Sequence, residues 1–138
     1  MPEVVKAEIK AFPFSLPTDV GWFTETPQQL SQPGTKYEDG VARGVVTFYW
    51  LCSWERAYIA AFNRQNSSDA ESALRMIEKF PATPFYTTSV EDPEHGWEHT
   101  VLDPAKLGDP SGMKQSFTQS CSQFKFDDRA SPSSTAVP

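Results

Sequence analysis

The feature that most constrains this chain is a proline-free segment, residues 35–65, in which large apolar side chains recur at helical spacing. One set, separated by three, four and seven residues, forms a single stripe on a helix: Tyr37, Val41, Val45, Phe48, Cys52, Ile59 and Phe62. A second set widens the apolar surface: Tyr49, Trp50, Trp54 and Tyr58. A helix that is apolar over most of its circumference is buried on several sides. The segment therefore predicts a long central helix, and Thr35 and Glu38 have the spacing of a capping box at its start.

A second helix is predicted directly after a turn at residues 66–68. Ser68 and Glu71 again have capping-box spacing. An amphipathic stripe follows, made of Ala70, Ala73, Leu74, Ile77 and Phe80, and Pro81 ends it. Because the connection is short, we expect this helix to fold back antiparallel on the central one.

The N-terminal third has a different pattern. In residues 3–12, Val5, Ala7, Ile9 and Ala11 alternate with charged residues, and this period of two favours a strand. Residues 14–34 contain Pro17, Pro27 and Pro33 between isolated large apolar residues. Since proline removes an amide donor and fixes φ, we expect an extended strap laid over the helical body.

The C-terminal third predicts shorter elements. We expect residues 81–90 to be extended, residues 93–99 and 104–107 to form single helical turns, and residues 111–124 to form a third helix. The composition of residues 127–138 is typical of a disordered tail. The predicted fold is thus mainly α and one domain overall: a strand and strap over residues 1–34, a helical body with an irregular C-terminal region over residues 35–126, and the tail.

Charge and hydropathy exclude two classes of partner. The net charge is −6, the pI is about 4.8, and the basic residues are scattered. Nucleic-acid binding depends on Lys and Arg that neutralise phosphates, so we expect no nucleic-acid partner. The longest apolar run, residues 45–52, is far shorter than the roughly 20 residues that a membrane span needs. We therefore expect no direct insertion into a membrane by this chain.

The compartment depends on the two cysteines, Cys52 and Cys121. They are either two buried reduced thiols, as in many cytoplasmic proteins, or one disulfide that ties the C-terminal segment to the central helix. Residues 1–10 do not resemble a signal peptide. The protein is therefore either cytoplasmic or an excised ectodomain with an added start Met. The even cysteine count, the proline-rich flanks and the Ser/Thr/Pro tail favour the disulfide and an extracytoplasmic location, secreted or as an ectodomain.

One short segment of the sequence matches a catalytic motif. His95, Glu98 and His99 match H-x-x-E-H, the inverted zinc-protease helix motif. Two histidines four residues apart on a helix can hold one Zn²⁺, and the Glu between them can act as base on a metal-bound water. Gly96 lies inside the motif, Pro93 precedes it, and no Glu follows Glu98 to serve as a further ligand. We therefore predict no metal site and interpret the segment as a solvated acidic turn.

The remaining motifs of catalysis are missing from the sequence: there is no G-x-S-x-G, no phosphate-binding loop and no G-x-G-x-x-G. We expect no catalytic residue, no cofactor and no enzymatic activity. The main functional candidates are Trp50, Trp54 and Tyr58, which step by four and share a second face of the central helix. If the strap leaves this face uncovered, it is a partner site, because exposed Trp and Tyr are typical anchors of interfaces.

Three function hypotheses follow. The leading one is a non-catalytic extracytoplasmic domain that binds another protein or supports an assembly as an accessory. The second is an inhibitor or immunity-type protein that uses its acidic charge to bind a basic enzyme. The third is a small zinc-dependent hydrolase that uses His95, Glu98 and His99.

Overall fold

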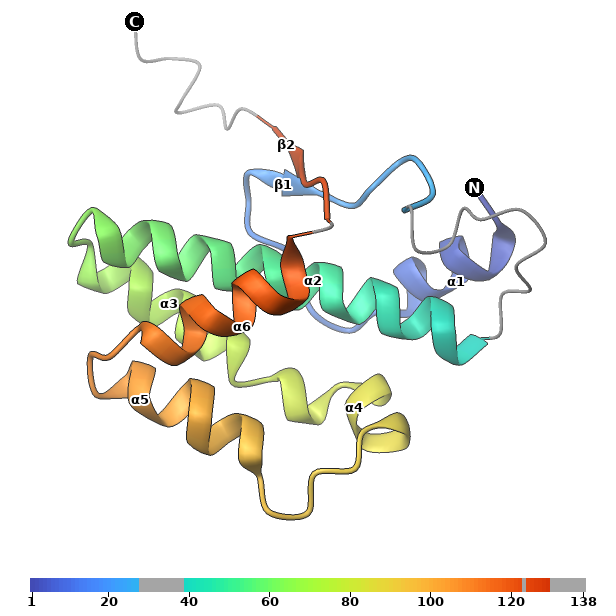
Figure 1. The fold of residues 1–138 in the computed structure, drawn as a ribbon. Helices are drawn as coiled ribbons and strands as arrows, with labels where there is room; N and C mark the ends of the chain where they lie inside the picture. The colour runs from blue at the N-terminus through green and yellow to red at the C-terminus, as the bar shows by residue number, and fades with distance from the viewer. Residues whose placement is uncertain (28–38, 123, 130–138) are drawn as a thin grey trace, which may run out of the picture.

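The structure is a computed structural model, and it describes residues 1–27, 39–122 and 124–129. The described residues fold into a mainly helical body with one small two-stranded sheet, which confirms the predicted fold class (Figure 1). In chain order the elements are α1 (Glu3–Ala11), β1 (Val20–Gly21), α2 (Asp39–Asn63), α3 (Ser67–Ile77), η2 (Phe80–Ala82), α4 (Pro84–Ser89), η3 (Glu98–Leu102), α5 (Asp103–Lys106), α6 (Ser111–Cys121) and β2 (Asp127–Asp128).

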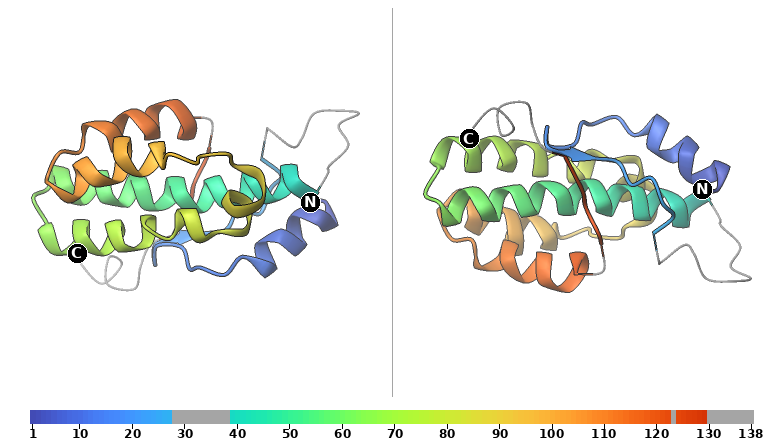
Figure 2. Two further views of the ribbon diagram at one scale, coloured as in Figure 1. Left: turned by 90° about the horizontal axis from the view of Figure 1, so that it is seen from below. Right: turned by 90° about the horizontal axis from the view of Figure 1, so that it is seen from above.

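The long helix α2 runs through the middle of the molecule, as the sequence predicts, and α1, α3 and α6 pack against it (Figure 2). Its side chains at Tyr49, Trp50 and Leu51 are all buried, so three neighbouring directions around the helix face protein. This is the burial expected of a helix that is apolar around most of its circumference. The predicted capping box at its start lies outside the described residues.

Helix α3 folds back antiparallel on α2, as predicted (Figure 1). The turn between them uses Gln65, whose φ of 62° reverses the chain. The predicted cap at Ser68 is wrong by two residues: Asn66 is the N-cap, and its side-chain oxygen accepts a hydrogen bond from the backbone N–H of Asp69 at 3.1 Å. Both Asn and Ser are good caps, and the earlier residue takes the role because the helix already begins at Ser67.

The strand predicted at residues 3–12 is wrong, because this segment is helix α1. Val5 and Ile9 are two steps apart in the alternating pattern but also four residues apart, so they share one helix face. Val5 is fully buried against α2. Glu3 in the first turn and Lys10 in the last turn suit the helix dipole. The pattern thus fits both periods, and packing against α2 selects the helix.

The strap is confirmed for the described residues that follow α1. It crosses α2 and supplies β1, which pairs antiparallel with β2, with Val20 opposite Asp128 and Gly21 opposite Asp127. The predicted disordered tail therefore begins too early, since Asp127 and Asp128 form a strand. Residues 130–138 lie outside the described residues, as do residues 28–34 of the predicted strap.

The C-terminal third is more helical than predicted. Residues 81–90 are not extended: Thr83 caps α4, its hydroxyl oxygen accepting from the Tyr86 N–H, and Pro84 is the first residue of that helix. Residues 96–106 form one continuous helical segment that includes the π-helix η3, instead of two separate turns. Proline is tolerated in the first turn of a helix, so Pro84 begins a helix within a segment that the sequence predicted to be extended. The third helix is confirmed as α6, which ends at Cys121, three residues before its predicted end.

Among the helices of the described residues, none combines the length and the hydropathy needed to span a membrane.

Candidate functional site

The predicted aromatic face of α2 is mostly covered. Trp50 is 0% exposed and Tyr58 is 2% exposed, so neither can anchor a partner at the surface. Trp54 is half-buried. The strap lies over this face at Trp50 and Trp54, whose indole N–H groups both donate to the carbonyl oxygen of Ser15, each at 2.9 Å. The condition for a partner site at this face, that it is left uncovered, is therefore not met at Trp50 and Tyr58.

Trp54 keeps access to solvent through a groove of about 620 Å³ between the strap, α2 and the start of α3. Its lining combines small apolar residues with charged and polar ones: Pro17, Thr18, Asp19, Val20, Ser53, Trp54, Arg56, Ala57, Ala60, Arg64, Asp69, Ser72, Ala73 and Asp128. Two ion pairs lie on this lining, Arg56 with Asp128 and Arg64 with Asp69, the latter at 2.7 Å. The groove therefore offers one aromatic ring and small side chains among fixed charges.

The H-x-x-E-H segment does not form the helix face that a zinc protease needs. His95 has a φ of 56° and precedes the helix, which begins at Gly96. The Asp92 carboxylate accepts from the backbone N–H of Gly96 at 2.7 Å and so sets this helix start. His95 Nδ1 lies 3.4 Å from Glu98, whereas His99 Nδ1 lies 3.1 Å from Asp103, so the two histidines contact different carboxylates.

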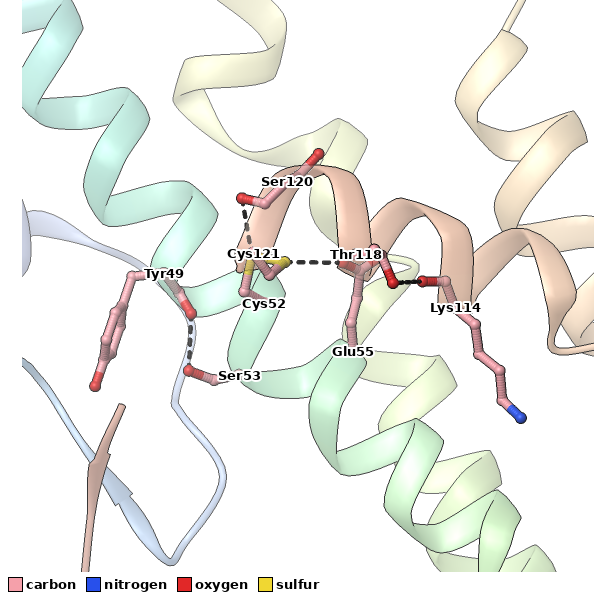
Figure 3. The surroundings of a disulfide bond; sticks show 8 residues. All are labelled: Tyr49, Cys52, Ser53, Glu55, Lys114, Thr118, Ser120 and Cys121. Carbon is pink, nitrogen blue, oxygen red and sulfur yellow. Dashed lines mark hydrogen bonds between the residues drawn. A yellow bond between two sulfur atoms is a disulfide. The ribbon is translucent and has the colours of Figure 1, made fainter. Parts of the chain in front are cut away.

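The two cysteines form a disulfide between α2 and α6, which confirms the bridged alternative (Figure 3). The Cys52–Cys121 S–S distance is 2.03 Å and the Cα atoms are 5.6 Å apart. Both residues are buried, at 0% and 1% exposure. While the bond is intact, neither sulfur can act as a nucleophile or a metal ligand, because both roles need the thiolate.

Sequence reasoning missed Glu55, which lies beside this disulfide on α2 and is 0% exposed. Its Oε1 lies 3.5 Å from the Sγ of Cys121 (Figure 3). Among the described residues, no hydrogen-bond partner is present for its Oε2. A disulfide sulfur has no hydrogen to donate, so this contact is a hydrogen bond only when the Glu55 carboxyl is protonated and donates. One signal in the sequence points to Glu55: it follows Cys52 by three residues and so shares its helix face.

The surroundings of Glu55 favour the protonated form. Burial raises the pKa of Glu55 to about 8. Hydrogen bonding from the Ser116 hydroxyl to the carboxyl group lowers the pKa, but this effect is smaller than that of burial. Desolvation disfavours the charged carboxylate, so near neutral pH the folded protein keeps this carboxyl mostly neutral. Among the described residues, the structure brings Cys52, Glu55 and Cys121 together as a group of three potential metal ligands, and this group excludes both histidines.

Two candidate functional features are a surface groove around Trp54 and a buried disulfide with an adjoining carboxyl. The first suits recognition, because an aromatic ring and fixed charges are open to solvent. The second is closed to substrates while α6 is in place. The chain matches no protein-family model, no curated protein and no solved structure.

Proposed function

We propose that the protein is a non-catalytic binding domain that works outside the cytoplasm and contacts another protein through the groove around Trp54. The observation that carries this proposal is the state of the Trp54 side chain: it is half-buried, its N–H is bound to Ser15, and it lines a groove. A Trp held in one orientation loses little conformational freedom on binding, which is why such residues often anchor interfaces.

The disulfide supports the choice of compartment. Disulfides persist in oxidising environments and are rare in the cytoplasm, where thiols are kept reduced. The Cys52–Cys121 bond joins positions 69 residues apart and is buried between two packed helices, as is typical of a structural bond. A bond that serves structure therefore supports an oxidising location, in a secreted protein or an ectodomain.

The groove also suggests the chemistry of the partner. Small residues at Ala57, Ala60 and Ala73 leave room beside the Trp54 ring for an apolar side chain. The ion pairs Arg56–Asp128 and Arg64–Asp69 provide charges of both signs on the lining. The partner is therefore a protein segment that inserts an apolar side chain between polar groups, and the net charge of −6 favours association with a basic protein.

Site-specific photo-crosslinking tests this proposal. A photoreactive residue at position 57, in the groove, is compared with one at position 3, where the Glu3 side chain is 91% exposed at the start of α1. We expect a defined crosslinked species from position 57 in a cell-envelope fraction, none from position 3, and loss of that species in a Trp54→Ala background that still melts cooperatively. Equal crosslinking from both positions, or a species that Trp54→Ala leaves unchanged, would contradict the proposal.

A further inference from the structure

Glu55 is a buried ionisable group that the disulfide does not explain. Moving a carboxyl group out of water costs free energy unless hydrogen bonds or charges compensate. Glu55 is 0% exposed, and its Oε2 lacks a hydrogen-bond partner in the described structure. A structural disulfide needs no carboxyl beside it. The side chain nevertheless points toward the bond, with Oε1 3.5 Å from Cys121 Sγ (Figure 3).

The three side chains have the chemistry and spacing of a zinc site. Each of the three residues Cys52, Glu55 and Cys121 offers one ligand atom, and these three atoms lie within 4.8 Å of one another. Zinc binds sulfur at about 2.3 Å and carboxylate oxygen at about 2.0–2.2 Å. Two tetrahedral ligands of one ion are then roughly 3.7 Å apart, so shifts of up to about 1 Å place all three atoms around one ion. Thiolates select soft or borderline metals such as Zn²⁺ over Mg²⁺ or Ca²⁺.

We propose that reduction of the Cys52–Cys121 disulfide converts this cluster into a site for one Zn²⁺ ion, with Cys52, Cys121 and Glu55 as its three protein ligands. This site lies outside the groove and is independent of the proposed function. A dithiol reductant supplies two electrons and two protons, becomes a disulfide itself, and leaves two thiols in the protein. Zinc then replaces the two thiol protons and the carboxyl proton where present, and these protons pass to solvent.

The fold holds the ligands and provides a route for the ion. Cys52 and Glu55 lie three residues apart on one face of α2, and α6 brings Cys121 onto that face. Helix α6 ends at Cys121, and the next residue, Ser122, is exposed. Once the bond is reduced, the last turn of α6 can open locally and admit the ion. Three protein ligands leave one tetrahedral position for a water molecule.

The test is metal binding by the full chain, reduced with a phosphine and kept free of oxygen. Native mass spectrometry is expected to show one Zn²⁺ per reduced chain and none on the oxidised protein. Co²⁺ used as a probe is expected to give the intense near-ultraviolet absorption of thiolate-to-cobalt charge transfer. A reduced protein that stays metal-free, or a Co²⁺ complex without that absorption, would overturn the proposal.

Variants assign the ligands. Glu55→Gln keeps the side-chain volume but removes the anionic ligand, and we expect it to weaken Zn²⁺ binding by at least about tenfold. Cys121→Ser removes one of the two sulfur ligands and is expected to remove at least half of the thiolate absorption, whereas His99→Ala, outside the cluster, is expected to leave affinity unchanged. Unchanged affinity in Glu55→Gln, or loss of binding in His99→Ala, would refute the assignment.

Circular dichroism keeps the test decisive if the reduced chain loses structure. In that case one equivalent of Zn²⁺ is expected to restore the helical signal in the wild-type chain, because an ion that binds only the folded state stabilises that state. Zinc that restores no helix in a reduced, unfolded chain would overturn the proposal as firmly as absent binding does.

Discussion

Trp50 and Trp54, one helical turn apart on α2, donate their indole N–H groups to the same acceptor, the carbonyl oxygen of Ser15, each at 2.9 Å. A carbonyl oxygen has two lone pairs and can accept both bonds. The shared acceptor fixes the strap across α2. It also explains why the strap covers Trp50 on the predicted aromatic face, while Trp54 still lines the groove.

This relationship predicts how the losses from the two tryptophans combine. In Trp50→Phe or Trp54→Phe the Ser15 carbonyl keeps one donor, whereas the double variant leaves it with none. Ser15 is exposed, so water can replace a lost donor, and each bond contributes about 0.5–1.5 kcal/mol. We therefore expect the two single losses in free energy of unfolding to add in the double variant within about 0.5 kcal/mol. A double-mutant cycle from urea denaturation measures this sum, and a coupling above about 1 kcal/mol would contradict it.

The packing of α6 predicts opposite results for two glycines. A Cβ at Gly112 would lie 2.1 Å from the carbonyl oxygen of Thr100, whereas a Cβ at Gly40 would meet nothing within 4 Å. Gly112→Ala is expected to lower the free energy of unfolding by about 1–3 kcal/mol through overpacking. Gly40→Ala, the matched control in α2, is expected to leave it unchanged or raise it by up to about 1 kcal/mol. Equal stabilities of the two variants would show that α6 does not pack so closely on η3.

The buried carboxyl of Glu55 predicts a pH dependence in the oxidised protein. Burial raises its pKa from the ordinary 4.5 to about 8 in the folded state. Between these values the unfolded chain is ionised at Glu55 while the folded chain keeps the proton, so the folded state binds more protons and stability falls as pH rises. The slope from this group is up to about 1.4 kcal/mol per pH unit.

The control is Glu55→Gln, which cannot ionise. The stability of the wild type relative to this variant is expected to fall between about pH 5 and about pH 8, because all other groups are common to both chains and cancel. Urea denaturation without reductant at several pH values measures the difference. Two curves that stay parallel over this range would show that Glu55 titrates with an ordinary pKa.

The disulfide predicts a large stabilisation. Joining residues 69 positions apart restricts the unfolded chain and is worth about 4 kcal/mol in the chain-entropy account. Cys52→Ala combined with Cys121→Ala is therefore expected to lower the free energy of unfolding by about that amount, as measured by urea denaturation without reductant. A loss below about 1 kcal/mol would mean that the packing of α6 on α2 holds the C-terminal segment without the bond.

The sequence predicted those features that depend on local pattern. Helix α2 follows from a long proline-free apolar segment, α3 from its amphipathic stripe, and α6 from spacing at Met113, Phe117 and Cys121. The bridge followed from the cysteine count together with composition. Local pattern was insufficient where two readings fit. The alternation around Val5 suits a strand or a helix, and Pro84 suits an extended segment or the first turn of a helix.

The candidate site was less predictable, because it depends on which elements meet. Trp50, Trp54 and Tyr58 do share one region of α2, but their exposure depends on the elements that pack over them: Trp50 is fully buried, whereas Trp54 is only half-buried. Glu55 looks like an ordinary charged helix residue in the sequence. Its role depends on α6, which brings Cys121 over it from 66 positions away.

The measurement that tests the account most directly is the redox state of Cys52 and Cys121 in the cells that make the protein. Acid quenching, alkylation with a mass-tagged thiol reagent and mass spectrometry read this state before and after chemical reduction. An extracytoplasmic domain held by a structural disulfide predicts no tag on either cysteine before reduction and one on each afterwards. Two tagged cysteines before reduction would contradict the account and indicate a chain that works reduced.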